Sequence, residues 1–267
     1  MQPFASFAVA DARTLLGVCF DIDDTVTKQG VLEADAYNAL FALAHAGLKL
    51  IAVTGRPLGF AEVAARMWPI DVAVGENGAG YIARARQGHG LLQGYWDEAG
   101  VRLVQQQKLR EIRMRVAHEL PHVKVSSDNW ARRCDLAFDV GEEEQLPRAE
   151  IERLVALLRT EGAHTTVSSV HAHAQLSDHD KALGVVRAAH EVLGLTAEEL
   201  RAHFLFVGDS GNDAAAFAWF THTVGVANVA HFLDRLSVPP RYVAQAERGA
   251  GFAEIARTLL QKRRESP

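Results

Sequence analysis

Three carboxylates follow directly on an apolar segment near the start of the chain. Residues 15–20 are almost all apolar and read as a buried strand, and Asp21, Asp23 and Asp24 come immediately after them. Carboxylates this close repel one another and raise one another's pKa unless a cation or good hydrogen bonds offset their charge. Carboxylate oxygens are also the ligands that divalent cations such as Mg²⁺ prefer. The pattern therefore predicts a metal site at the end of this strand.

Further polar residues stand at comparable places later in the chain. Thr54 follows an apolar run, and Lys181 opens a predicted helix. Asp209 follows another apolar run, and Asp213 comes four residues later. Taken singly, each has an ordinary explanation, because an aspartate after a strand often caps a helix and a lysine is usually a surface charge. Together they favour one site, since the carboxyl ends of parallel strands meet at the same edge of a sheet.

Strands and helices alternate over the first part of the chain and again from residue 180 onward. Apolar runs rich in branched residues predict the strands, and apolar residues at helical spacing predict the helices between them. Such alternation is typical of an α/β fold with a Rossmann-like parallel sheet and right-handed crossovers. The predicted helices are 33–46, 57–68, 180–193, 214–220 and 251–261, and the predicted strands are 15–20, 48–53, 72–74, 204–207, 223–226 and 242–243.

The character of the sequence changes near Ala85. A glycine-rich and basic connection at 84–98, which includes Arg86, leads into a different order of elements. The predicted helices there are 101–119 and 147–161, and the predicted strands are 123–126, 134–140, 165–170 and 171–176. This order is typical of an α+β module with an antiparallel sheet. We therefore predict a main domain formed by residues 1–84 and 180–267, with an inserted module at 85–179.

Composition restricts the classes of partner. The chain has 267 residues, is 48% hydrophobic and carries a formal charge of -5, so it can bury a sizeable core but lacks the basic surface typical of nucleic-acid binding. No basic region followed by an apolar one opens the sequence, and no apolar run reaches the roughly 18 residues that a membrane span needs, so we expect neither a signal peptide nor a membrane span. Cys19 and Cys134 lie in apolar runs and are expected to be buried free thiols. We expect a cytoplasmic protein, monomeric or weakly dimeric, that binds neither nucleic acid nor membrane.

Four motifs of this sequence resemble those of a known family. In order along the chain they are Asp21-Ile22-Asp23-Asp24-Thr25, Thr54-Gly55-Arg56, Lys181, and Gly208-Asp209-Ser210-Gly211-Asn212-Asp213. This series resembles the four motifs of the haloacid dehalogenase (HAD) superfamily of phosphohydrolases. The place of the insertion, between the second and third motifs, and the turn at 75–79 resemble the Cof-like, type IIB branch, which includes sugar phosphatases and phosphomannomutases.

The resemblance implies a role for each residue that would touch the phosphate. Asp21 would attack phosphorus and form an aspartyl phosphate. Asp23 would lie on the same face two residues later and act as the general acid and base, with Ile22 pointing away. Thr54 through its hydroxyl and Lys181 through its charge would bind the phosphoryl oxygens.

The resemblance also implies a Mg²⁺ site. Asp21, the backbone carbonyl of Asp23, and Asp209 would hold the ion, with Asp213 orienting the ligands. Asp24 is expected to be a solvated or capping carboxylate. Two further residues are secondary candidates for the metal shell, namely Ser210 and Asn212.

The inserted module would close over the site and recognise the leaving group, as the inserted modules of other family members do. An aromatic residue and hydroxyl-binding polar groups in two segments of the module would suit a sugar. The residues we expect to contact substrate are Gly55, Arg56 and Asn77 from the main domain, and Ser126, Asp128, Arg132, His171 and His173 from the module.

We accordingly expect a Mg²⁺-dependent phosphatase that acts on a small phosphate ester, with a sugar phosphate as the preferred reading. A phosphomutase is the nearest alternative, because it uses the same aspartyl phosphate but returns the group to a sugar. A phosphorylation-switched binding module is a remote alternative. Such modules place the phosphorylated aspartate after a later strand and lack an insertion.

Overall fold

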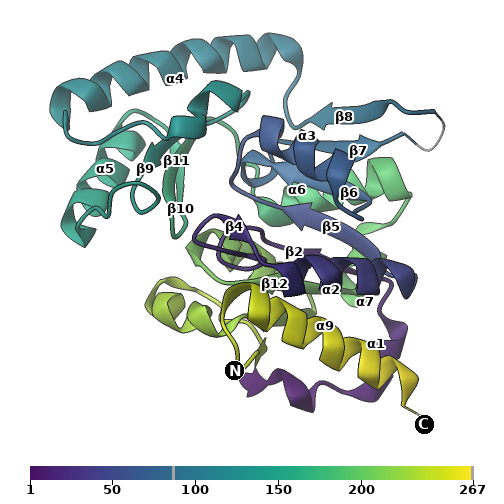
Figure 1. Ribbon diagram of the computed structural model, residues 1–267. Helices are drawn as coiled ribbons and strands as arrows, with labels where there is room; N and C mark the ends of the chain where they lie inside the picture. The colour runs from purple at the N-terminus through teal and green to yellow at the C-terminus, as the bar shows by residue number, and fades with distance from the viewer. Residues whose placement is uncertain (86–87, 266–267) are drawn as a thin grey trace.

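The computed structural model describes residues 1–85 and 88–265 (Figure 1). Its largest feature is a nine-stranded sheet whose central strands pair in parallel, while β7 and β8 pair antiparallel at one edge. This α/β architecture confirms the predicted fold class. The strand order is β1 (Gln2–Pro3), β14 (Tyr242–Val243), β13 (His222–Gly225), β12 (Phe204–Gly208), β2 (Gly17–Phe20), β5 (Lys49–Val53), β6 (Val72–Gly75), β7 (Gly80–Arg84) and β8 (Leu91–Tyr95).

Helices cover both faces of this sheet. Successive residues of a strand point to opposite faces, so Val18 and Phe20 of β2 join one apolar cluster while Cys19 between them joins the other. The first cluster packs against α1 (Val9–Thr14), α2 (Ala34–His45), α3 (Leu58–Met67) and α9 (Arg248–Arg264). The second packs against α6 (Lys181–Ala188), α7 (Ala197–His203) and α8 (Ala214–Trp219).

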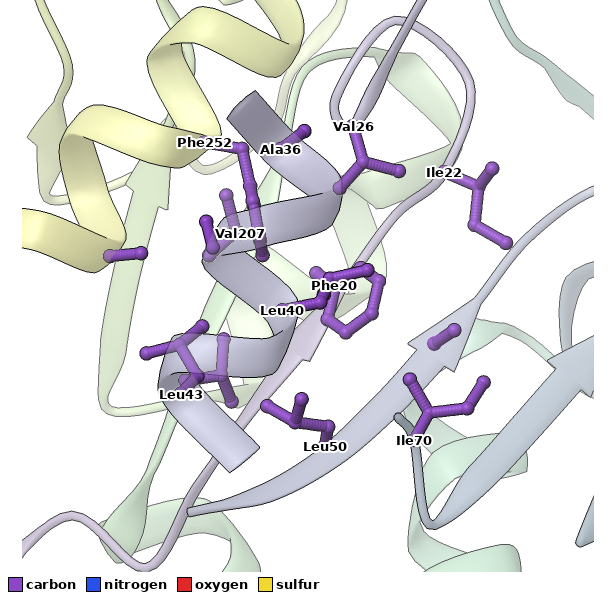
Figure 2. Packing of buried hydrophobic residues seen from close by; sticks show 14 of the residues in the cluster. Phe20, Ile22, Val26, Ala36, Leu40, Leu43, Leu50, Ile70, Val207 and Phe252 are labelled. Carbon is purple, nitrogen blue, oxygen red and sulfur yellow. The ribbon is translucent and has the colours of Figure 1, made fainter. Parts of the chain in front are cut away.

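The first apolar cluster fixes the strand that carries the three carboxylates. Figure 2 shows Phe20 of β2 lying beside Leu40 of α2, and the Phe20 ring lies 5.2 Å from that of Phe252 on α9, measured between centroids. Burying a side chain of this size stabilises the fold by about 1.5–3 kcal/mol. Ile22 also belongs to this cluster, so it points away from the carboxylates, as predicted.

A second, smaller sheet lies at one end of the molecule (Figure 1). It has three antiparallel strands in the order β10-β11-β9, and an apolar cluster of its own includes Ile112, Phe138 and Leu154. From here on, the inserted module denotes residues 99–175, a shorter range than the predicted 85–179. Its elements are α4 (Ala99–Glu119), the 3₁₀ helix η3 (Ser127–Ala131), β9 (Leu136–Asp139), α5 (Arg148–Thr160), β10 (His164–Val167) and β11 (His171–Gln175).

The predicted connection at 84–98 is different in the structure. It contains β8, which pairs antiparallel with β7 and so extends the large sheet; Arg86 and Gln87 lie outside the described residues. The division into a main domain and an inserted module stays a prediction, and the pairing of β8 favours a first boundary after Tyr95.

Several smaller elements also differ from expectation. The strand predicted at 123–126 is reduced to a single bridge between Val125 and Phe138, because the chain turns into η3 directly afterwards. Helices α1 and α7 and the hairpin formed by β3 (Thr27–Lys28) and β4 (Val31–Leu32) were not predicted. Both cysteines are buried and free, as expected. Within the described ranges, none of the helices combines the length and apolar character needed to cross a bilayer.

Candidate active site

Three neighbouring parallel strands bring the predicted residues to one edge of the sheet. β2 lies between β12 and β5, with Phe20 in register with Val207 on one side and Ala52 on the other. Asp21, Asp209 and Thr54 follow these three strands at their carboxyl ends. The register therefore places all three at the same edge, where open parallel sheets bind ligands.

Three carboxylates gather there in a buried cluster. Asp21, Asp209 and Asp213 each offer one oxygen, and these oxygens all lie within 4.8 Å of one another. Burial, together with neighbouring carboxylates, raises the pKa of Asp21 to about 8 and that of Asp209 well above its usual range. Like charges in a buried, all-oxygen site are stabilised by a divalent cation, so the donor set fits Mg²⁺.

Lys181 is the one cation that touches this cluster among the described residues. Its Nζ lies 2.6 Å from Asp21 Oδ1 and 2.7 Å from Asp213 Oδ1. Burial lowers the pKa of Lys181, but the two carboxylates outweigh burial and raise that pKa above its ordinary value. One lysine offsets only part of the charge of three carboxylates. The site therefore still favours an added cation.

The start of α6 holds Lys181 in place. The Asp180 side chain caps the helix by accepting a hydrogen bond from the backbone N–H of Leu183 at 2.8 Å. The helix also packs very closely on the turn at 76–78, since a Cβ on Gly78 would lie 2.2 Å from the carbonyl oxygen of Asp180, and one on Gly184 would lie 2.3 Å from the Cα of Gly78. Two glycines thus allow α6 to approach the sheet edge closely enough for Lys181 to reach Asp21.

Hydrogen bonds orient the other two carboxylates. Asp213 Oδ2 accepts from the backbone N–H groups of Asp209 at 2.8 Å and Ser210 at 3.1 Å. Asp209 accepts from Thr25 Oγ1 at 3.3 Å and from Asn228 Nδ2 at 3.0 Å. The sequence reasoning missed Asn228. Its position shortly after β13, at the same sheet edge, was the available signal.

Asp23 lies beside Arg56 and outside the side-chain cluster. Arg56 Nη2 and Nε donate to Asp23 Oδ1 at 2.7 and 2.9 Å, and Nε also lies 3.0 Å from Oδ2. Thr54 Oγ1 is 3.5 Å from Asp23 Oδ2 and accepts from the Arg56 backbone N–H at 3.0 Å. The structure therefore brings Thr54, Asp23 and Arg56 together.

Asp24, expected to be a solvated or capping carboxylate, has a side chain that is only 16% exposed and is paired with an arginine. Its Oδ1 accepts from Arg248 Nε at 3.0 Å, and its backbone carbonyl accepts from Asn228 Nδ2 at 3.0 Å. Arg248 is the first residue of α9. Asp24 therefore connects the active-site loop to the last helix of the fold.

The secondary metal candidates bind other side chains. Ser210 Oγ donates to Asn212 Oδ1 at 3.0 Å, and Asn212 Nδ2 donates to Asn77 Oδ1 at 3.2 Å. Asn77 Nδ2 in turn reaches Thr166 Oγ1 on β10 at 3.4 Å. A metal role for Ser210 and Asn212 stays a prediction, while Asn77 joins the site to the inserted module.

A pocket of about 630 Å³ opens between the sheet edge and the inserted module. Asp23 and Asp209 line it on the sheet side. Glu142, Gln145 and Ser169 line it on the module side. Glu142 was missed because it begins the run Glu142-Glu143-Glu144, which in sequence is indistinguishable from an ordinary solvated loop.

The predicted substrate contacts of the module do not border this pocket. His171 and His173 are buried, and their ring nitrogens lie 2.8 Å from Glu142 Oε2 and Asp135 Oδ2 respectively. Arg132 is turned inward and donates to the carbonyl of Gly55 at 2.9 Å. The two histidine contacts lie within the module, as does that of Ser126 with Asp128, whereas the Arg132 contact crosses the junction with the sheet. Their contact with substrate stays a prediction, as does that of Gly55, Arg56 and Asn77.

Comparison with known proteins gives a match at the level of structure. No protein-family model and no curated protein sequence matches the chain. A structure from Thermoplasma acidophilum superposes with a TM-score of 0.69 at 17% identity, covering 92% of this chain and 98% of that chain. The sucrose-phosphatase of Synechocystis, solved with sucrose and phosphate, gives a TM-score of 0.63 at 18% identity over 94% and 98% of the two chains.

Another similar structure is BT1666 from Bacteroides thetaiotaomicron, a phosphatase of the HAD superfamily. Its TM-score is 0.60 at 18% identity, covering 93% of this chain and 96% of that chain. Similar structures also include a sugar phosphatase of HAD subclass IIB. At these identities the similarity shows the fold, which is the fold of HAD phosphatases over nearly the whole chain.

Proposed function

We propose that this chain is a HAD phosphatase that uses Mg²⁺ to hydrolyse a small phosphate monoester, with a sugar phosphate as its substrate. The observation that carries the proposal is the buried cluster of Asp21, Asp209 and Asp213 around Lys181. It lies at the carboxyl edge of a sheet whose fold is shared with HAD phosphatases. We also propose that the protein acts in the cytoplasm, where two unpaired cysteines would stay reduced.

The first chemical step would use Asp21 and Asp23. An Asp21 oxygen attacks phosphorus, the bond from phosphorus to the leaving oxygen breaks, and Asp23 gives its proton to that oxygen. Asp23 then takes a proton from water as the water oxygen bonds to phosphorus, the bond from phosphorus to the Asp21 oxygen breaks, and inorganic phosphate leaves a free Asp21 carboxylate. Lys181 and Thr54 would bind the phosphoryl oxygens and stabilise the charge of the transition state.

The side chains of Asp21 and Asp209 and the backbone carbonyl of Asp23 would hold the metal. Asp213 would orient the backbone around Asp209. When bound, Mg²⁺ would reduce the repulsion between the Asp21 carboxylate and the phosphate.

The lining of the pocket supports a sugar as the leaving group. Gln29, Gln145 and Ser169 are among the residues that line it. Amides and hydroxyls of this kind both donate and accept hydrogen bonds, as sugar hydroxyls require.

The test is phosphate release from a panel of sugar phosphates with Mg²⁺. We expect Asp21→Asn and EDTA each to abolish turnover, while Asp178→Asn, a change at an exposed carboxylate, leaves it intact. Activity that survives Asp21→Asn or EDTA would contradict the proposal. Transfer of the phosphoryl group to a second sugar hydroxyl would indicate a phosphomutase, and a long-lived aspartyl phosphate without turnover would indicate a switch.

A further inference from the structure

One guanidinium joins three carboxylates at the junction of the sheet and the inserted module. Arg56 binds Asp23 through Nε and Nη2, as described above. Its Nη2 also lies 2.6 Å from Glu142 Oε1, and its Nη1 lies 3.5 Å from Asp128 Oδ2. Glu142 and Asp128 belong to the inserted module, whereas Asp23 and Arg56 follow strands of the large sheet. The Arg56 side chain is only 12% exposed, so these contacts are largely shielded from solvent.

Partners within the module hold both of its carboxylates in place. His171 Nε2 lies 2.8 Å from Glu142 Oε2. The His171 hydrogen bond, followed by Arg56, lowers the pKa of Glu142 to about 2 against the effect of burial. Arg132 donates to Asp128 Oδ1 through Nε at 3.1 Å and Nη2 at 3.0 Å. The module therefore presents two charged, oriented carboxylates to Arg56.

Arg56 contacts Asp23 and Glu142 but does not line the pocket that they line. Asp23 and Glu142 both line the 630 Å³ pocket. Arg56 instead lines a separate pocket of about 580 Å³, together with Phe60 and Trp130. A side chain in this place is suited to hold Asp23 and Glu142 side by side at the pocket wall without contacting the substrate.

The shape of the guanidinium makes this contact directional. Its planar fork of N–H donors matches carboxylate geometry, unlike the point charge of a lysine. With the module docked, Asp23 and Glu142 share Nη2, Asp23 also binds Nε, and Asp128 lies near Nη1. With the module away from the sheet, the fork would be constrained by Asp23 alone, and the Asp23 carboxylate could rotate with it.

We propose that Arg56 is a positioning residue that couples docking of the inserted module, through Glu142, to the orientation of the Asp23 carboxylate. This inference rests on the proposed function, in which Asp23 protonates the leaving group. In this inference Glu142 acts by binding Arg56 and not by recognising the substrate. Asp23 would thus be held in the orientation needed for proton transfer only when the module is docked.

The test compares two leaving groups in Glu142→Gln, which keeps the size of the side chain and removes its charge. An alkyl phosphate needs a proton on its leaving oxygen, whereas an aryl phosphate such as p-nitrophenyl phosphate departs readily without one. General acid catalysis is worth about 10²–10⁴-fold, and the variant keeps Asp23. We therefore expect kcat for the alkyl phosphate to fall about 10-fold more than kcat for the aryl phosphate. Arg56→Lys should shift this ratio in the same direction.

The matched control is Glu144→Gln, on the same loop. Glu144 is 52% exposed and pairs with Lys124, so the ratio of the two activities should stay at the wild-type value. An equal loss on both substrates in Glu142→Gln would show that Glu142 binds substrate or supports the fold, and would overturn the inference. A kcat that stays at the wild-type value for both substrates would overturn it as well.

A second measurement does not depend on activity. Small-angle X-ray scattering without substrate should give a larger radius of gyration for Glu142→Gln than for wild type and Glu144→Gln, because the module loses its main contact with Arg56. Equal radii would show that Arg56 does not hold the module and would overturn the inference. If wild type released no phosphate while the radii differed, the proposed function would fail and the docking contact would stand.

Discussion

Two buried cations divide the carboxylates of the site between them. Lys181 contacts Asp21 and Asp213, while Arg56 contacts Asp23. The choice of cation fits each place, because a lysine is a compact charge that can share a site with a metal ion and a phosphate, whereas an arginine fixes the direction of a carboxylate. The proposed nucleophile and the proposed general acid are thereby held separately, although only one residue lies between them in the chain.

Removal of the Lys181 charge should make the fold depend more strongly on Mg²⁺. In Lys181→Met the Asp21 and Asp213 carboxylates lose their buried partner, a change that typically costs about 3–5 kcal/mol. A bound cation offsets part of that loss, because a ligand that binds only the native state stabilises it. We expect the increase in Tm on adding Mg²⁺ to be larger in Lys181→Met than in wild type.

The same variant should lose catalysis. Loss of one donor to the transition state commonly costs about 10²–10³-fold in kcat. The control is Lys49→Met, because Lys49 is 52% exposed and pairs only with Asp71 among the described residues. An equal increase in Tm on adding Mg²⁺ in Lys181→Met and wild type would mean that the cation does not bind at this cluster.

At the scale of elements, the strands that carry the site could be predicted and the contacts between elements could not. The strands before Asp21, Thr54 and Asp209 are buried on both faces, so each reads in sequence as an unbroken apolar run. β8 was missed because its sequence, Leu-Leu-Gln-Gly-Tyr, lies among glycines and pairs only at the sheet edge. Glu142 was missed because its role depends on the distant Arg56, to which no local pattern points.

One buried carboxylate connects the elements of the sheet to the module. Glu76 accepts hydrogen bonds from the backbone N–H groups of Leu58 at 2.9 Å, Arg133 at 2.9 Å, Cys134 at 2.6 Å and Asp135 at 3.0 Å. Leu58 begins α3, and the other three lead into β9. A single side chain thus fixes both the helix after the Thr54 loop and the entry to the module sheet.

Truncation of Glu76 should destabilise the protein strongly. Glu76→Ala leaves several buried N–H groups without an acceptor, and each costs about 1–3 kcal/mol. We expect the free energy of unfolding in urea to fall by about 3 kcal/mol or more. Glu62→Ala, on the exposed side of α3, should change it by less than about 0.5 kcal/mol. Similar values for the two variants would contradict this role of Glu76.

At the scale of the whole molecule, several polar contacts join the sheet to the module. The module has its own apolar cluster, and the contacts across the junction include Arg56 with Glu142, Asn77 with Thr166, and Arg132 with the carbonyl of Gly55. Interfaces of this kind within a chain commonly permit relative motion. If the proposed function holds, we expect the module to move away from the sheet for substrate to enter and product to leave.

A reversible cross-link between the two parts tests this motion. A Cβ on Gly59 of α3 would lie 3.0 Å from the Cβ of Ala131 at the end of η3, slightly shorter than the range of about 3.5–4.5 Å that a disulfide needs. We expect Gly59→Cys with Ala131→Cys to form a disulfide after a small shift, without interference from Cys19 or Cys134, which are buried.

The oxidised double variant should turn over substrate much more slowly than the same protein after reduction, because a closed module blocks the exchange of substrate and product. The single variant Gly59→Cys should respond to neither oxidant nor reductant, and it controls for the loss of the glycine. Full activity in the oxidised form would show that the 630 Å³ pocket exchanges its contents with the module docked. In that case docking would be a permanent feature of the fold, and Arg56 would hold Asp23 in one orientation throughout the reaction.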